Sequence, residues 1–398
     1  MEEVKKLNME INPKLEDIRC EITLTECDKQ KSIELNDFYL PIYISTDFDY
    51  KQSLCAKLDN YLKAIEGRKL VSEEVYRRTE VNIEKIKEAI DSYYDANISA
   101  AKEAILKVLT DYRSNKFIIS KLDESPAVRG ITRIKKSPHE PPMAYGELSF
   151  FRARIGTSGF RKSDFLHIPF NKRGYVTTQR FSIAGVPCMY FGLTSYVCWL
   201  ELNKPLDREF NVASYEVNPN INVLNLAISQ MLINGLSNLE EMEPDVSSLI
   251  EFFPLVIATS YKVAEENRGF YSEYIISQLV MQCLTELDID GVFYISKRVE
   301  RDSESFPYAV NLAVPMKNNS ELYSDFAKKI PLTKPINFAE YNNLIRQPNS
   351  SAKYSSYANL WEDVPMSYIG KRIRYSQLIY SGFDDYLFSE DHTEVDDI

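Results

Sequence analysis

The chain reads FFRARIG from Phe150 to Gly156 and FLHIPFNKRGYVTTQRFSIAGVPCMYFGLTSYVCWLEL from Phe165 to Leu202. Polar and charged side chains interrupt this mainly aromatic and apolar stretch at separated places: Arg152, Arg154, Arg180, Tyr190 and Glu201. The glutamate closes the apolar run Tyr-Val-Cys-Trp-Leu, where we expect a desolvated carboxylate. Since burying a carboxylate is costly unless it is paired or used, this position predicts a chemical role.

The order of these residues resembles the RES family, which is named for an Arg, a Glu and a Ser. The family pattern runs aromatic-Arg, Gly-Arg-aromatic-Asn, Gly-x-Pro-x-x-Tyr-aromatic/Leu-Gly/Ala, and then Glu about eleven residues after the Tyr. Matching pieces occur here in the same order: Phe151-Arg152, Gln179-Arg180-Phe181-Ser182, the segment from Gly185 to Gly192, and Glu201. Ser296, after the apolar run that begins at Gly291, supplies the serine. Gln-Arg-Phe-Ser departs from the Gly-Arg-Trp-Asn of small members.

The resemblance covers roughly residues 145–317 and implies both a fold and an activity. The fold is α+β, with the split β core and helices of RES and ADP-ribosyltransferase-like proteins. The activity is cleavage of the nicotinamide–ribose bond of NAD, which is a substrate rather than a cofactor. Small members are toxins of bacterial toxin–antitoxin pairs, so a toxin or defence effector and an antitoxin or regulatory partner are implied. Water, inorganic phosphate or a protein side chain stays open as the acceptor. A glycohydrolase, a phosphorylase, a protein ADP-ribosyltransferase and a non-catalytic nucleotide-binding module therefore all remain.

The resemblance also implies roles for the matched residues. Glu201 would stabilise the oxocarbenium-like transition state of bond cleavage. Arg152 and Arg180 would hold phosphate and ribose, because a guanidinium presents paired donors to anionic oxygens. Tyr190 would stack on nicotinamide or a sugar. Ser296 would hydrogen-bond the nicotinamide amide or hold Glu201 in position.

Each assignment has a plainer alternative. Arg154 shares the strand face of Arg152 and is its rival for the phosphate. Tyr190 alternates with apolar neighbours as a packed core residue does, and Ser296 at a strand end is typical of a turn. Glu201 could pair with Lys204 at a surface.

Composition narrows the class of protein. The chain of 398 residues has 44% hydrophobic and 26% charged residues, typical of a globular protein long enough for two or three units. Its net charge of −11 argues against nucleic acid as the main partner. The stretch between Arg152 and Arg180 is locally basic, which fits either a pyrophosphate-binding cleft or a solvated face.

Neither a metal site nor a secreted or membrane protein is expected. The six cysteines include no Cys-x-x-Cys, and the three histidines lack the spacing of metal ligands. The first residues, MEEVKKLNMEINPK, contain no apolar leader, and no segment approaches the roughly eighteen apolar residues of a membrane span. We therefore expect a cytoplasmic protein with free thiols. Arg133 and His139 loosely match a HEPN ribonuclease pattern, which we interpret as chance.

Three segments are predicted along the chain. Residues 1–142 form a mainly helical region, with short extended pieces before residue 50, helical stripes at 54–65, 72–90 and 98–109, and Ser72 as an N-cap. This region is expected to regulate access to the site, to oligomerise, or only to complete the core. A proline-rich boundary, Ser137–Pro142, precedes the RES-like domain at 143–330.

Within the RES-like domain, helices are expected at 250–264 and 271–287. Strands are expected at the following ranges: 150–155, 215–218, 222–226, 291–296 and 309–315. Residues 188–201 are expected to be strand or a strand-to-helix transition. Residues 331–398 form a C-terminal extension whose acidic tail, Ser389–Ile398, is expected to be disordered.

Overall fold

The structure is a computed structural model, and it confirms the α+β class. It describes residues 38–44, 49–66, 71–128, 133–135, 148–157, 159–229, 233, 244–262, 268–302, 305–318, 321–347, 357–360 and 365–395. The predicted boundary Ser137–Pro142 and His139 lie outside these ranges. None of the described helices is long and apolar enough to cross a membrane.

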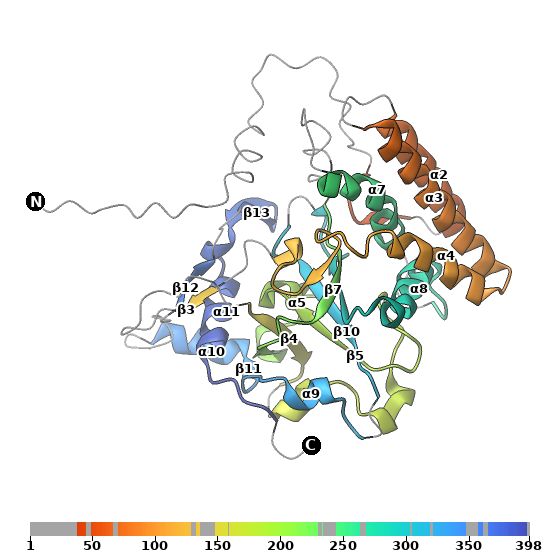
Figure 1. The fold of residues 1–398 in the computed structure, drawn as a ribbon. Helices are drawn as coiled ribbons and strands as arrows, with labels where there is room; N and C mark the ends of the chain where they lie inside the picture. The colour runs from red at the N-terminus through yellow and green to blue at the C-terminus, as the bar shows by residue number, and fades with distance from the viewer. Residues whose placement is uncertain are drawn as a thin grey trace, which may run out of the picture.

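Three amphipathic helices of the N-terminal region lie along one side of the molecule (Figure 1): α2 (Tyr50–Ile65), α3 (Glu73–Tyr94) and α4 (Ile98–Thr110). The predicted cap is confirmed, since the Ser72 side chain accepts a hydrogen bond from the backbone N of Val75 at 3.2 Å. Asp49 and Asn97 cap α2 and α4 in the same way. Each helix therefore begins where a short polar side chain can satisfy its first N–H groups.

Two later helices pack under this layer: α7 (Pro244–Thr259) and α8 (Ile275–Cys283). From Phe252 to Ala258 every apolar side chain of α7 is buried, because α2 and α3 cover one side of the helix and the sheet side covers the other. Two tyrosine hydroxyls of α2 donate to α7 carbonyls, Tyr50 to Ala258 at 2.8 Å and Tyr61 to Ile250 at 3.0 Å. The N-terminal helices and α7 thus share one hydrophobic core.

The central sheet has eight described strands in the order β11-β6-β4-β5-β10-β9-β7-β2. Their bounds are β2 Ile119–Lys121, β4 Phe150–Ile155, β5 Cys188–Gly192, β6 Phe210–Tyr215, β7 Asn222–Leu226, β9 Gly291–Ile295, β10 Val310–Pro315 and β11 Ile336–Asn337. Only β7 and β9 pair in parallel within it. The strand predicted at 215–218 is wrong in position. The strand β6 ends at Tyr215, and the backbone N of Glu216 donates to the Pro331 carbonyl at 3.0 Å.

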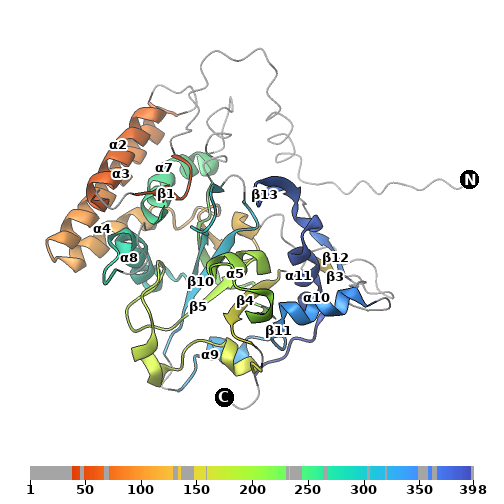
Figure 2. The ribbon, with the colours of Figure 1, turned by 180° about the vertical axis from the view of Figure 1, so that it is seen from behind.

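Side chains alternate between the two faces of the sheet, as the pleat requires. Val292 and Ala313 face the core under α7 and α8, whereas Phe293 and Leu312 face a second core. The second core is covered by α5 (Ser195–Glu201), α9 (Asp325–Lys329), α10 (Phe338–Arg346) and α11 (Ile379–Ser389). Figure 2 shows α10 and α11 on the side of the molecule opposite α2 and α3. Helices therefore cover both faces of the sheet.

Short strands complete the fold outside the central sheet. The strand β1 (Ile42–Tyr43) pairs in parallel with β8 (Tyr261–Lys262), where an extended piece was expected. Two antiparallel pairs join β3 (Arg133–Lys135) to β12 (Tyr357–Leu360) and β13 (Pro365–Tyr368) to β14 (Lys371–Arg374).

The acidic C-terminal residues belong to the folded molecule as far as Val395, which corrects the expectation of a disordered tail there. Thr393 forms a bridge with Leu332, and Lys162 donates to the Thr393 hydroxyl at 2.7 Å. The ring of His392 is within 3.1 Å of the Ser214 hydroxyl. The bridge to buried Leu332 and the contact with Ser214 of β6 thus outweigh the polar composition of this segment. Residues 396–398 lie outside the described ranges.

Candidate active site

A cavity of about 550 Å³ opens between the sheet and the segments that follow α7 and precede α8, and we refer to it as the central cavity. Its volume lies in the range of sites for small molecules and cofactors. Four of the sequence-predicted residues line it: Arg152 from β4, Arg180 from the connection before β5, Tyr190 from β5, and Glu201 from the end of α5. The fold thus brings together residues that are up to 49 positions apart, from Arg152 to Glu201.

The sheet is weakly joined at the point where the cavity forms. Strands β4 and β5 share one residue pair, Phe151 with Gly192, whereas β4 pairs with β6 over its whole length. Arg152 and Phe191, next to this pair, both line the central cavity. Because β4 and β5 are paired at only one position, they separate beside the cavity and leave room for a ligand.

Gly192 is required for the turn from β5 into α5. A Cβ at this position would lie 2.4 Å from the Val197 side chain and 2.9 Å from the Thr194 carbonyl oxygen. Thr194 caps α5 by accepting from the Val197 backbone N at 3.1 Å, and its own hydroxyl donates to the Tyr308 carbonyl. This close approach sets the direction of α5 and so the place of Glu201.

The expected strand-to-helix transition is present, since β5 ends at Gly192 and α5 ends at Glu201. Glu201 is exposed, so the expectation of a desolvated carboxylate is wrong. The helix buries most of its other side chains, including Val197 and Leu200, and its last residue lines the cavity. A carboxylate is unfavourable at a helix C-terminus. The amide of Asn311 on β10 offsets this by donating to the Glu201 Oε1 at 2.7 Å. Lys204 instead lies over the Trp199 ring.

Arg180 is buried, with 8% of its surface exposed. Its guanidinium donates to the carbonyls of Thr259 at 3.2 Å and Ile295 at 2.8 Å, and it lies 4.4 Å from the centre of the Tyr294 ring. Burial lowers the pKa of this guanidinium. These contacts use part of its five N–H donors, so others can meet a ligand.

The turn that carries Arg180 is closed by Ser182. Its hydroxyl accepts from the Gln179 backbone N at 3.0 Å and donates to the Gln179 carbonyl at 2.8 Å. The Tyr190 hydroxyl also donates to the Phe181 carbonyl at 2.9 Å, and burial raises the pKa of Tyr190. Tyr190 thus positions this turn while its ring faces the cavity.

The two arginines of β4 differ in their surroundings. Arg152 lines the central cavity and donates to the Phe165 carbonyl at 3.0 Å. Arg154 is half-buried and does not line it, although burial and the nearby Arg152 charge lower its pKa. The geometry therefore favours Arg152 over Arg154 as the residue that could meet a phosphate in the cavity.

Ser296 is buried at the end of β9 and is not a lining residue of the cavity. Its hydroxyl accepts from the Arg298 backbone N at 3.1 Å, which is the bond of a turn-forming serine. It therefore stabilises the turn that holds Lys297 and Arg298, which both line the cavity.

Sequence reasoning missed several lining residues, including Lys262, Tyr274, Tyr294, Lys297, Arg298 and Asn311. The basic pair Lys297-Arg298 directly follows a buried strand, and this signal could have identified it. Asn311 gives no such signal, because only the pairing of β10 with β5 brings it near Glu201. Among the described residues, no group of three or more His, Cys, Asp or Glu side chains could hold a metal ion.

Comparison with known proteins gives one informative similarity. The chain is 32% identical over 184 residues to a Bacillus subtilis (strain 168) protein named "Putative toxin YopC". The match covers 43% of this chain and 42% of the relative, so the chain spans less than half the length of the relative it matches. No family model matches the chain, and no solved structure matches it. Part of this chain therefore resembles a protein named as a toxin.

Proposed function

We propose that the protein is an NAD-consuming enzyme that cleaves the bond between nicotinamide and ribose. The observation that carries this proposal is the meeting of Arg152, Arg180, Tyr190 and Glu201 in one cavity of suitable size. A site that only binds a nucleotide has use for the arginines and the tyrosine. It does not need a carboxylate held at its edge by an amide, as Asn311 holds Glu201.

The proposed reaction breaks the C1′–N bond of the nicotinamide riboside. The bonding electron pair goes to the nicotinamide nitrogen, so that neutral nicotinamide leaves and positive charge develops on the ribose. The Glu201 carboxylate stabilises this charge, which is greatest in the transition state. An acceptor then adds to C1′, and when the acceptor is water the products are ADP-ribose, nicotinamide and one proton.

The surroundings of Glu201 favour water as the acceptor. The carboxylate is exposed, so solvent reaches the position where the ribose carbon would lie. Arg152 and Arg180 supply positive charge for the two phosphates, and the ring of Tyr190 offers an aromatic face to a base. Inorganic phosphate and a protein side chain are alternative acceptors that the same assay distinguishes by product.

A toxin-like role is part of this proposal, and its support is the name of the relative in Bacillus subtilis. An enzyme that consumes NAD harms the cell that holds it, so we further propose restraint by an antitoxin or other regulatory protein. The predicted regulatory or oligomerising role of the N-terminal region belongs to the same proposal.

The test is to incubate the full chain with NAD and to separate nicotinamide, ADP-ribose and ADP-ribose phosphate by chromatography. Glu201→Gln keeps the size and hydrogen-bonding capacity of the side chain but removes the charge. We expect at least a roughly 100-fold loss in kcat, as for the loss of one electrostatic stabiliser. Glu124→Gln, at an exposed position outside the cavity, is the control. Wild-type turnover by Glu201→Gln would exclude the proposed role of Glu201, and absence of nicotinamide release by the wild type would exclude the reaction.

A further inference from the structure

Two cationic side chains line the central cavity, and within the described ranges the buried nitrogen of one of them makes no hydrogen bond. Arg180 and Lys297 both line the cavity. The Lys297 Nζ is buried and makes no hydrogen bond in the part of the chain that the structure describes. It lies 4.9 Å from the centre of the Tyr274 ring. An unpaired buried ammonium is costly, so this arrangement calls for an explanation.

The two carboxylates whose charge acts on Lys297 each have another polar partner. Glu201 and Glu273 both act on Lys297 through their charge. However, Glu201 accepts from Asn311 at 2.7 Å, and Glu273 pairs with Arg268 at 3.2 Å. Burial in the first place, and then the charge of Arg180, hold the pKa of Lys297 well below its usual 10.5. A charged Lys297 would therefore be buried beside the Arg180 charge, and these surroundings favour the neutral amine.

We propose that Lys297 and Arg180 together bind a phosphate-type anion, and that Lys297 takes up a proton when the anion arrives. The planar Arg180 guanidinium can meet two phosphate oxygens, and the flexible four-carbon stem of Lys297 can turn its nitrogen into the cavity. An anion between them replaces the repulsion of two cations by two attractions. If the ligand is NAD, its pyrophosphate group binds to Arg180 and Lys297, and this form of the proposal rests on the proposed function. Binding of free phosphate or pyrophosphate does not depend on that function.

The sign of the pH dependence follows from this linkage. The anion raises the pKa of Lys297 in the complex above that in the free protein, so binding consumes a proton between the two values. Affinity is then greatest at low pH and falls as pH rises through this window, by at most tenfold per pH unit for one proton. A lysine that is already charged in the free protein would show no such window.

The experiment is isothermal titration calorimetry of the full chain in two buffers of equal pH and different ionisation enthalpy. The probes are inorganic phosphate, inorganic pyrophosphate and ADP-ribose. We expect proton uptake of up to one per site with pyrophosphate or ADP-ribose. Lys297→Arg should bind without uptake, because arginine stays protonated. Lys297→Met should lose roughly 10- to 100-fold in affinity together with the uptake.

Lys317→Met is the matched control, because Lys317 is exposed and pairs with Asp290 outside the central cavity. It should behave as the wild type. Uptake by inorganic phosphate alone would identify a free anion as the ligand, and uptake only by ADP-ribose would identify a nucleotide phosphate. Uptake that persists in Lys297→Arg, or no binding of any probe, would overturn the proposal. Binding of these probes does not require cleavage. The result can therefore be interpreted even if the protein does not hydrolyse NAD.

Discussion

At the scale of single residues, the site depends on small differences in position along one strand. Arg152 and Arg154 are two residues apart on β4 and share a face, yet only Arg152 lines the central cavity. Phe151, directly before Arg152, pairs with Gly192, which marks the end of the contact between β4 and β5. Arg152 therefore lies where the two strands separate, and Arg154 lies beyond it along β4.

This difference predicts a contrast between two otherwise similar variants. Arg152→Ala should raise the KM for NAD roughly 10- to 100-fold, the loss expected for a charge-assisted hydrogen bond to phosphate. Arg154→Ala should leave KM within a few-fold of the wild type, and Arg152→Lys should rescue only in part, because an ammonium lacks the paired donors. Steady-state kinetics and circular dichroism of the three proteins provide the measurement. If Arg154→Ala raised the KM for NAD more than Arg152→Ala, the phosphate contact would belong to Arg154.

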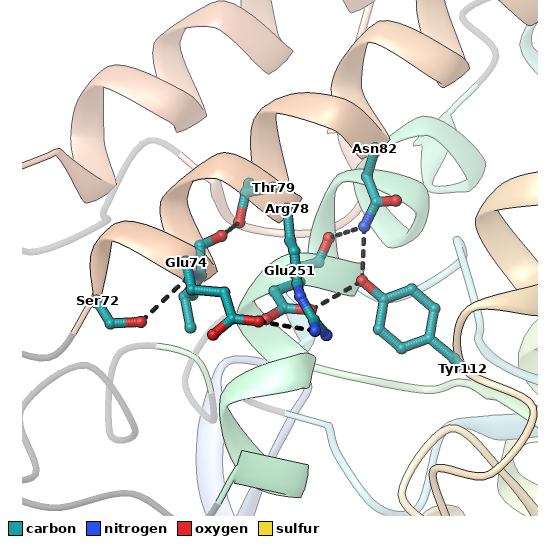
Figure 3. Close-up of polar contacts among 8 residues, drawn as sticks. Ser72, Glu74, Arg78, Thr79, Asn82, Tyr112 and Glu251 are labelled. Atoms are coloured by element: carbon teal, nitrogen blue, oxygen red, sulfur yellow. Dashed lines mark hydrogen bonds and ion pairs between the residues drawn. The ribbon is translucent and has the colours of Figure 1, made fainter.

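At the scale of helices and strands, a buried polar network joins α3 to α7 (Figure 3). The Asn82 amide donates to the Glu251 carbonyl at 2.9 Å and to the Tyr112 hydroxyl at 2.6 Å, and this hydroxyl donates to the Glu251 carboxylate at 3.2 Å. The Arg78 guanidinium is 3.9 Å from the same carboxylate and 2.8 Å from Glu74. Buried networks of this kind fix the register of packed elements, provided that each member is satisfied.

Glu251 gives this network a pH dependence. Burial raises the pKa of its carboxyl above the usual 4.5, and the opposing effects of Arg78 and Tyr112 are smaller. The folded state therefore holds the proton more tightly than the unfolded state. The contribution of Glu251 to the free energy of unfolding is greatest below the unfolded pKa and declines as pH rises through the folded pKa.

Glu251→Gln should flatten that part of the stability profile. Urea unfolding of both proteins, from below pH 4.5 to neutral pH, gives two curves whose difference isolates this carboxyl, because the other groups titrate in both. As pH rises, the free energy of unfolding of the glutamine variant should increase relative to that of the wild type. Parallel curves would show that the carboxyl titrates alike in the folded and unfolded chains.

At the scale of the whole molecule, the N-terminal helices and the sheet form a continuous interior. Apolar residues of α2, α3 and α4 belong to the same core as α7, α8 and one face of the sheet. The sheet itself takes β2 from the N-terminal segment and β11 from beyond residue 330. The carbonyl of Thr259, at the end of α7, also accepts from Arg180 in the cavity. The helical layer is thus linked to the site through α7, which is the physical basis for its proposed regulatory role.

This continuity predicts a single unfolding transition. Ile86 on α3 is fully buried, and Ile86→Ala should cost roughly 2–5 kcal/mol, as for other large-to-small core substitutions. Far-UV circular dichroism follows the helices, whereas tryptophan fluorescence includes Trp199 on α5. Both signals should shift together to lower temperature. Val81→Ala, at a 40% exposed position of the same helix, should change little. Separate transitions would mean that the helices unfold on their own.

The sequence by itself determined most of the local elements, and it predicted four residues that line the central cavity. Helical stripes with polar caps, as at Ser72, predict α2 to α4 because the spacing of apolar residues and the capping bond are local properties. Apolar runs ended by turns predict β7, β9 and β10 in the same way. The order of Arg152, Arg180, Tyr190 and Glu201 predicts one site, and the four residues do line one cavity.

Only the tertiary structure decided what surrounds those residues. Glu201 is exposed rather than desolvated, because the direction of α5 depends on the close contact at Gly192. Thr393 is ordered by pairing with Leu332, although its neighbours are acidic. Asn311 reaches the cavity through the pairing of β10 with β5, and no local pattern marks it. Burial and pairing between distant segments are properties of the packed chain, so they set the charge state and the partners of a side chain after the local sequence has chosen its helix or strand.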